Sequence, residues 1–193
     1  MKRIIIIGSL LLLCSSVFGQ TSIHATTIKI LPKSTLSITG DTNINKFLCS
    51  FNTELIAENN HITYQPGDSK IYFQNAILKL DNSGFDCGNK AINKDFKNLI
   101  KAEEYPEISL ELEEIILTDI KKAFAKVIIK IAGETNTYTV PVEITSDETI
   151  QYKGSLDLNI SDFKLHPPKK MFGLIVIRED ININFILKVK NKY

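Results

Sequence analysis

The side chains whose types could support metal binding or acid–base chemistry are three histidines and scattered carboxylates. His24, His61 and His166 lie far apart and have no metal-ligand spacing. The chain also lacks G-x-S-x-G, H-E-x-x-H, C-x-x-C and phosphate-loop motifs. No two carboxylates form a convincing acid–base pair. We therefore expect a protein that is not an enzyme and holds no metal or other cofactor; a lipid hydrolase built around Asp162 is the remaining catalytic alternative.

The N-terminus has the layout of a secretory signal peptide. Two basic residues precede an apolar run over 4–13, and small residues follow at Val17 and Gly19. The run is too short to cross a bilayer, and no later segment is apolar enough for a stable membrane span. We expect residues 1–19 to be the signal peptide and residues 20–193 to form one periplasmic or secreted domain.

Cys49 and Cys87 are the cysteines that remain after cleavage, because Cys14 leaves with the signal peptide. Lipid attachment at Cys14 is the weaker alternative, since Leu13 is larger than the residue that lipoprotein processing prefers. An even number of cysteines in an exported protein predicts a disulfide. That bond would stabilise the fold by roughly 4 kcal/mol on the loop-entropy model. Two separately buried thiols are the alternative.

The charge of the exported domain is close to neutral. Cleavage removes Lys2 and Arg3 from the 23 basic residues and leaves all 22 acidic ones. Nucleic acid binding requires a basic face that displaces counterions, so it is not expected. Adhesion to anionic lipid by charge alone is not expected either.

One amphipathic helix is predicted over 89–101. Its apolar side chains recur at helical spacing, and Pro106 requires the helix to end before it. Asp86, Gly88 and Asn89 supply the start signal, since short polar side chains accept hydrogen bonds from first-turn amides. The apolar stripe consists of Ile92, Phe96, Leu99 and Ile100.

The rest of the domain consists of strands and turns. Eight segments alternate apolar and polar residues or have strand composition: 34–39, 46–55, 70–80, 107–117, 121–132, 136–145, 149–159 and 180–190. Turn signals separate them at Gly40 with Asp41, Pro66 with Gly67, 81–84, Thr118 with Asp119, Gly133, and Ser146 with Asp147. The predicted fold is all-β: an eight-stranded antiparallel barrel, wide enough for one small ligand, with one short capping helix.

Alternation also divides each strand into an apolar and a polar face, although the segment 71–80 is ambiguous. The apolar faces form the predicted interior, because the opposite faces carry charged residues. The same period describes a packed core and a ligand cavity, and the pattern alone favours a packed core. In a hollow barrel, the ligand-lining residues would be Phe47, Phe51, Leu110, Leu112, Ala125, Val127, Ile129, Val140, Tyr152, Leu156 and Phe185.

Several short motifs occur in an order that resembles the YceI-like family of polyisoprenoid-binding proteins. The matching residues are Gly88 and Asn89, then Tyr105, Pro106 and Ile108, then Gly133, Thr135, Thr139 and Val142, and finally Asp162 and Phe163. The resemblance implies an exported, lipocalin-like barrel that encloses one long apolar molecule, such as a polyisoprenoid or an isoprenoid quinone. Burying each CH₂ group is worth about 0.8 kcal/mol, so a long tail binds without specific polar contacts. With this resemblance, a binding cavity becomes the favoured interpretation.

The chain departs from the family pattern at positions where many members carry arginine. Ile92 and Ile160 stand there, Asn93 replaces an acid, and Lys164 replaces a glycine. Two donors that could meet a ligand head group are thus missing. The cysteine pair indicates a distinct branch of the family, so the ligand's head group and length stay open.

Two elements are candidates for a gate at the end of the barrel. One is the helix, through Phe96, and the other is the proline-stiffened segment 165–173, through Met171 and Phe172. We expect an exported barrel that stores or carries an apolar, isoprenoid-like molecule between membranes. The alternative is a filled structural barrel that docks a protein partner through 165–173. Pairing of two barrels into a homodimer is left open.

Overall fold

The computed structural model describes residues 22–56, 59–168 and 174–192. The described chain forms strands, one α-helix and three short 3₁₀ helices. The strands are β1 (His24–Ile30), β2 (Thr35–Thr42), β3 (Lys46–Phe51), β4 (Asn60–Pro66), β5 (Lys70–Gln74), β6 (Ile77–Asp81), β7 (Phe85–Asp86), β8 (Glu107–Asp119), β9 (Lys122–Ile131), β10 (Glu134–Ser146), β11 (Ile150–Asn159) and β12 (Ile177–Lys192). The helices are η1 (Thr53–Leu55), η2 (Asn82–Gly84), α1 (Lys90–Leu99) and η3 (Ile160–Phe163).

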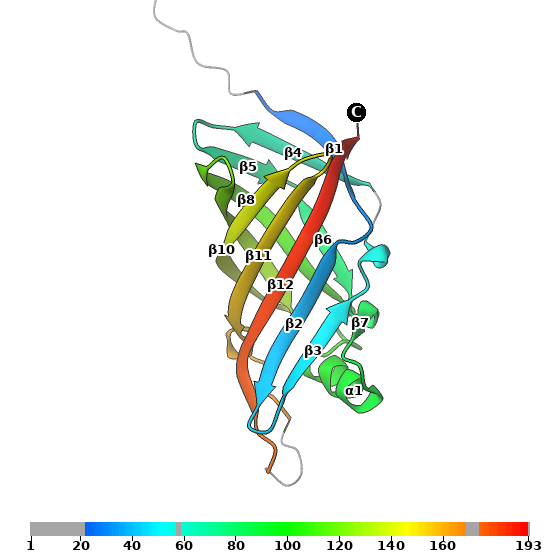
Figure 1. The fold of residues 1–193 in the computed structure, drawn as a ribbon. Helices are drawn as coiled ribbons and strands as arrows, with labels where there is room; N and C mark the ends of the chain where they lie inside the picture. The colour runs from blue at the N-terminus through cyan, green and yellow to red at the C-terminus, as the bar shows by residue number, and fades with distance from the viewer. Residues whose placement is uncertain (1–21, 57–58, 169–173, 193) are drawn as a thin grey trace, which may run out of the picture.

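The strands close into an antiparallel barrel (Figure 1). Neighbours follow the order β1-β4-β5-β8-β9-β10-β11-β12, and β12 pairs back with β1, which makes a ring of eight strands. The predicted eight-stranded barrel is therefore confirmed. Its membership differs from the prediction, because β1 and β4 belong to the ring while β2 and β3 branch from β12.

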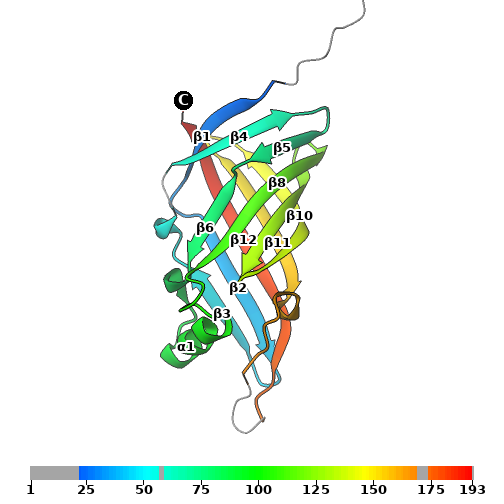
Figure 2. The same ribbon diagram turned by 180° about the vertical axis from the view of Figure 1, so that it is seen from behind.

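β12 is long enough to pair with two different strands along the same edge. Its first part pairs with β2, from Ile177 opposite Thr42 to Ile186 opposite Thr35. Its last part pairs with β1, where Ile30 lies opposite Val189. Figures 1 and 2 show β4 and β5 at the end opposite α1, with β2, β3 and β7 near α1.

The segment 70–80 was predicted as one strand and is two, because Asn75 adopts a left-handed backbone with φ 61°. β5 before it pairs with the C-terminal part of β8, and β6 after it pairs with the N-terminal part of β8. The break shifts the alternation by one residue. Phe73 therefore shares a face with Leu78 and Leu80, which explains the ambiguous pattern in the sequence.

Two other predicted boundaries were wrong near the start of the barrel. Gly40 lies inside β2, opposite Phe47, rather than in a turn. The turn falls after Thr42, whose hydroxyl donates to the Asn45 carbonyl and accepts from the Asn45 amide. β3 ends at Phe51, because Asn52 caps the 3₁₀ turn η1 through the amide of Glu54.

Helix α1 agrees with the prediction within two residues at each end. Asn89 is its N-cap and accepts a hydrogen bond of 2.8 Å from the amide of Ala91. The ring of Phe96 lies 5.1 Å from that of Phe85, and Ile100 is buried. Ile92 was placed on the inward stripe and is exposed instead. Within the described chain, no helix has the length and apolar character needed to cross a membrane.

Candidate functional site

The predicted lining residues all lie on the inward faces of the strands. Four are buried: Phe51, Ala125, Ile129 and Val140. The others are half-buried: Phe47, Leu110, Leu112, Val127, Tyr152, Leu156 and Phe185. Their place in the interior follows from alternation, whereas their contact with a ligand stays a prediction.

The interior is packed unequally along the barrel. Near α1, inward side chains are almost fully covered: Phe163 and Cys49 have no exposed surface, and Phe85 and Leu158 are under 5% exposed. We call this region the closed end. Toward the opposite end, several inward apolar side chains are only half-buried. We call six of them the half-buried face: Ile71, Phe73, Ile115, Ile144, Tyr152 and Leu187.

Register places the half-buried face inside the barrel. Ile71 on β5 lies opposite Ile115 on β8, which lies opposite buried Ala125 on β9. On the other wall, Tyr152 of β11 lies between Ile144 and Leu187. Opposed residues of an antiparallel pair share a face, so these side chains all point inward. The protein's own side chains thus leave this part of the apolar interior incompletely covered.

Two of the predicted lining phenylalanines are fixed by glycines on neighbouring strands. A Cβ at Gly40 would meet the ring of Phe47 at 2.2 Å, and one at Gly154 would meet the ring of Phe185 at 2.4 Å. The far edge of each ring therefore lies against the glycine that it faces across the ladder, in space that a side chain there would fill. The inward shape of the barrel at these positions is set by the glycines, a relationship that alternation alone does not reveal.

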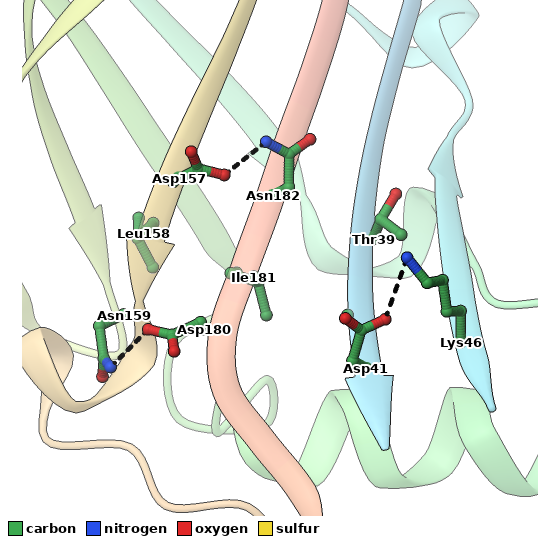
Figure 3. A pocket seen from close by; sticks show the side chains of 10 residues that line it. Thr39, Asp41, Lys46, Asp157, Leu158, Asn159, Asp180, Ile181 and Asn182 are labelled. Carbon is green, nitrogen blue, oxygen red and sulfur yellow. Dashed lines mark hydrogen bonds and ion pairs between the residues drawn. The ribbon is translucent and has the colours of Figure 1, made fainter. Parts of the chain in front are cut away.

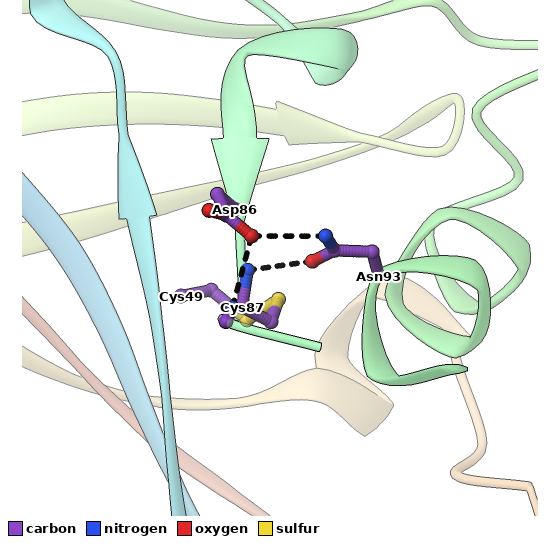
Figure 4. Close-up of a disulfide and its surroundings, with 5 residues drawn as sticks. Cys49, Asp86, Cys87 and Asn93 are labelled. Carbon is purple, nitrogen blue, oxygen red and sulfur yellow. Dashed lines mark hydrogen bonds between the residues drawn. A yellow bond between two sulfur atoms is a disulfide. The ribbon is translucent and has the colours of Figure 1, made fainter. Parts of the chain in front are cut away.

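The Cys49–Cys87 disulfide secures the closed end and confirms the predicted pairing (Figure 4). β3 and β7 pair through only two positions, Ser50 with Asp86 and Phe51 with Phe85. The cysteines are the next residues in that register, with Cα atoms 3.9 Å apart. The covalent bond thus extends a ladder that is too short to hold the sheet edge by hydrogen bonds alone.

A polar network next to the disulfide fixes the entry into α1. Asp86 Oδ1 accepts hydrogen bonds from the Asn93 amide group and from the Gly88 backbone, both 2.9 Å. Asn93 Oδ1 in turn accepts from the Cys87 backbone at 2.6 Å (Figure 4). The Asn93 side chain, followed by the Gly88 backbone, lowers the pKa of Asp86 below its usual value. Asn93 thus holds both the Asp86 carboxylate and the Cys87 backbone at the start of the helix.

Motifs that are separate in sequence meet at the closed end. The ring of Tyr105 covers Gly133, whose φ is +84°, and would lie 2.9 Å from a Cβ at that position. Asn82, which is 2% exposed, donates to the Tyr105 carbonyl at 2.7 Å, and its backbone amide donates to the Pro106 carbonyl. These residues close the barrel bottom, which is a structural role rather than a chemical one. The part played by Asn82 was missed in the sequence, because a lone asparagine carries no pattern.

Asp162 belongs to the same closed end. Its Oδ2 accepts a hydrogen bond from the Tyr138 phenol, and its backbone carbonyl accepts one from the Asn136 side chain at 2.7 Å. Phe163 beside it is fully buried and stacks on Tyr138. Both polar groups of Asp162 are thus used in holding η3 against β10.

The proposed gate is described only in part. Phe96 packs against Phe85 beside the closed end. Met171 and Phe172 lie outside the described residues.

The three histidines lie in separate places. His166 lies 3.7 Å from a Glu179 oxygen, while His24 stacks on Tyr64 and His61 contacts Thr27. No group of three metal-ligating side chains occurs within residues 22–56, 59–168 and 174–192.

A polar groove of about 450 Å³ crosses the outside of β2, β11 and β12 (Figure 3). Its polar groups satisfy one another: Asn182 donates to Asp157 at 2.7 Å, Asn159 donates to Asp180 at 2.8 Å, and Lys46 lies 3.7 Å from Asp41. Other than the inward Leu158 and Ile181 beneath it, polar residues dominate its lining. None of the predicted lining residues contributes to it, and its internal pairing indicates a role in holding strand register.

Comparison with solved structures supports this fold. A crystal structure of Burkholderia cenocepacia BcnA aligns with a TM-score of 0.62 at 20% identity, covering 82% of this chain and 96% of that one. A polyisoprenoid binding domain from Saccharophagus degradans, implicated in plant cell wall breakdown, aligns with a TM-score of 0.62 at 10% identity, covering 86% and 99%. The Campylobacter jejuni YceI protein aligns with a TM-score of 0.52 at 16% identity, covering 90% and 85%.

No curated protein is similar enough to the chain to count as a match. The family model described as the YceI-like domain, however, matches residues 33–189, which is most of the chain and includes every motif of the closed end. The chain therefore belongs to the YceI-like family.

Proposed function

We propose that the protein is an exported carrier that holds an apolar, isoprenoid-like molecule inside its barrel, for storage or for transport between membranes. The observation that supports this most is the half-buried face, a set of apolar side chains that point inward without being covered. Apolar surface left uncovered costs about 25 cal/mol per Å², so a hydrocarbon that covers it gains that free energy. The name of the Saccharophagus degradans domain points to the same class of ligand.

Export is part of the proposal and rests on the N-terminal sequence. A basic pair, an apolar run and small residues up to Gly19 precede the barrel. The mass of the protein recovered from an exporting cell should correspond to a chain that begins at Gln20. A chain that keeps its first 19 residues in that fraction would contradict this step.

Native mass spectrometry of the gently purified protein, followed by lipid extraction, tests the binding step. We expect a co-purifying hydrocarbon of defined mass. A clean apo mass, repeated after incubation with an isoprenoid quinone and with an isoprenyl phosphate, would instead favour the filled barrel that docks a partner.

A matched pair of variants locates the molecule. Ile144→Trp places a large ring on the half-buried face and should abolish the bound mass, while Thr145→Trp places the same ring on the outer face of β10 and should retain it. Equal retention in both variants would show that the hydrocarbon binds elsewhere on the protein. The same spectra report whether two barrels pair.

A further inference from the structure

Tyr152 is the one member of the half-buried face with a polar group. Tyr64 of β4 also points inward, opposite Phe73, but its ring stacks on His24. Tyr152 is the third residue of β11, on an inward position between Ile144 of β10 and Leu187 of β12. The next inward position along β11 is Gly154, which is covered by the ring of Phe185. The phenol thus projects into apolar surroundings on both sides of its strand.

Within the described chain, the Tyr152 hydroxyl has no hydrogen-bond partner, in contrast to the Tyr138 hydroxyl, which donates to Asp162. Its inward neighbours in register carry no acceptor side chains. Burial alone accounts for the raised pKa of Tyr152, with no charge or hydrogen bond contributing. The phenol therefore keeps its proton at neutral pH and remains a donor without an acceptor from the protein.

We infer that Tyr152 is a specificity-determining residue that donates a hydrogen bond to an oxygen of the bound molecule, and so selects an oxygen-bearing isoprenoid over a pure hydrocarbon. This inference rests on the proposed function. A donor within an apolar surface discriminates strongly, because a ligand without an acceptor leaves the phenol unsatisfied when it displaces water. An acceptor oxygen on the ligand, such as a quinone carbonyl, satisfies the phenol where the protein does not.

The test compares two probes with similar isoprenoid tails: squalene, which has no oxygen, and a ubiquinone whose tail has the same number of carbons. Their dissociation constants are measured for the wild type, Tyr152→Phe and Tyr72→Phe. Tyr72 is the matched control, since it is an exposed phenol on β5 whose neighbours Ile71 and Phe73 face inward. Melting temperatures of all three proteins verify that they are folded.

Tyr152→Phe should weaken ubiquinone binding by roughly fivefold to tenfold, as expected for the loss of one net hydrogen bond. The same variant should bind squalene at least as well as the wild type, and Tyr72→Phe should change neither constant. Unchanged ubiquinone binding in Tyr152→Phe, or an equal loss for both probes, would overturn the inference while leaving the carrier function intact. A wild type that binds neither probe would overturn both.

Discussion

The phenol of Tyr138 on β10 donates a 2.9 Å hydrogen bond to Oδ2 of Asp162 in η3, across the closed end of the barrel. Tyr138 points inward and also stacks on Phe163, the most completely buried large side chain of the described chain. The pair thus joins the family's late Asp-Phe motif to the wall of the barrel. A carboxylate engaged in this way serves as an anchor, which leaves little support for a hydrolase built around it.

Tyr138→Phe should lower the free energy of unfolding by about 1 kcal/mol, because it deletes one hydrogen bond to a partly solvated carboxylate and keeps the ring stacking. Urea unfolding measures the change. Thr139→Ser, on the outer face of the same strand, is a control that should have a much smaller effect. A Tyr138→Phe protein as stable as the wild type would show that stacking on Phe163 alone secures η3.

Alkaline pH should weaken the fold through the same phenol. Burial, and then the hydrogen bond and charge of Asp162, raise the pKa of Tyr138 above its usual value near 10. The folded state thus favours the neutral phenol, and its stabilising effect is complete below pH ~10 and lost as pH rises beyond that value. Melting temperatures between neutral pH and pH ~11 should fall less steeply for Tyr138→Phe. Part of the fall should persist, since the pKa values of Tyr105 and Tyr152 are raised too.

Removal of the disulfide should destabilise the closed end more than any single hydrogen bond there. The bond spans 38 residues, and replacing both Cys49 and Cys87 by alanine should cost about 2–4 kcal/mol in a urea titration. Reduced wild-type protein is the matched control and should unfold at a similar denaturant concentration. If both unfold like the oxidised protein, the packing of Phe51 on Phe85 is sufficient for the β3–β7 edge.

Gly133 and Gly88 offer a matched pair that isolates one contact. Both have a positive φ, but a Cβ at Gly133 would collide with the Tyr105 ring, whereas one at Gly88 would meet nothing within 4 Å. Gly88→Ala should therefore cost about 1 kcal/mol from backbone strain alone, and Gly133→Ala should cost about 1–3 kcal/mol more from overpacking. Thermal or urea unfolding gives both values. Equal losses would mean that the Tyr105 ring moves aside freely.

The sequence predicts the long strands well and the ends of the barrel poorly. β8 to β12 alternate apolar inward residues with mostly polar outward ones, so their bounds agree with the prediction within a few residues. β1 and β4 were missed because their inward positions include Thr26, His24 and Tyr64 rather than an aliphatic run. β7 has only two residues and exists through its pairing with β3 and the disulfide.

For the site, alternation predicts which side chains face inward but not how closely they pack. Val140 and Ile144 lie four residues apart on one face of β10, yet the first is buried and the second half-buried. That difference depends on which strands meet across the barrel, and no local pattern contains it. Polar partners such as Asn93 with Asp86 are likewise formed by tertiary contact.

The Asn93–Asp86 pair predicts what happens when position 93 carries the acid that many family members have there. Asn93→Asp restores a carboxylate where many members have one, but here it would face Asp86 and replace the donor that Asp86 uses. The hydrogen bond from Asn93 lowers the pKa of Asp86, so its stabilising effect is present at neutral pH and lost as pH falls through and below the usual aspartate value near 4. In Asn93→Asp the two carboxylates repel at neutral pH, and protonation of either one relieves the repulsion.

The melting temperature of Asn93→Asp should therefore lie below that of the wild type at pH 7, and the gap should narrow as pH falls toward 4. Asn98→Asp, on an exposed position of the same helix, introduces the same charge away from Asp86 and serves as the control. A gap that stays constant with pH would mean that loss of the Asn93 contact to the Cys87 amide, rather than charge repulsion, destabilises the variant.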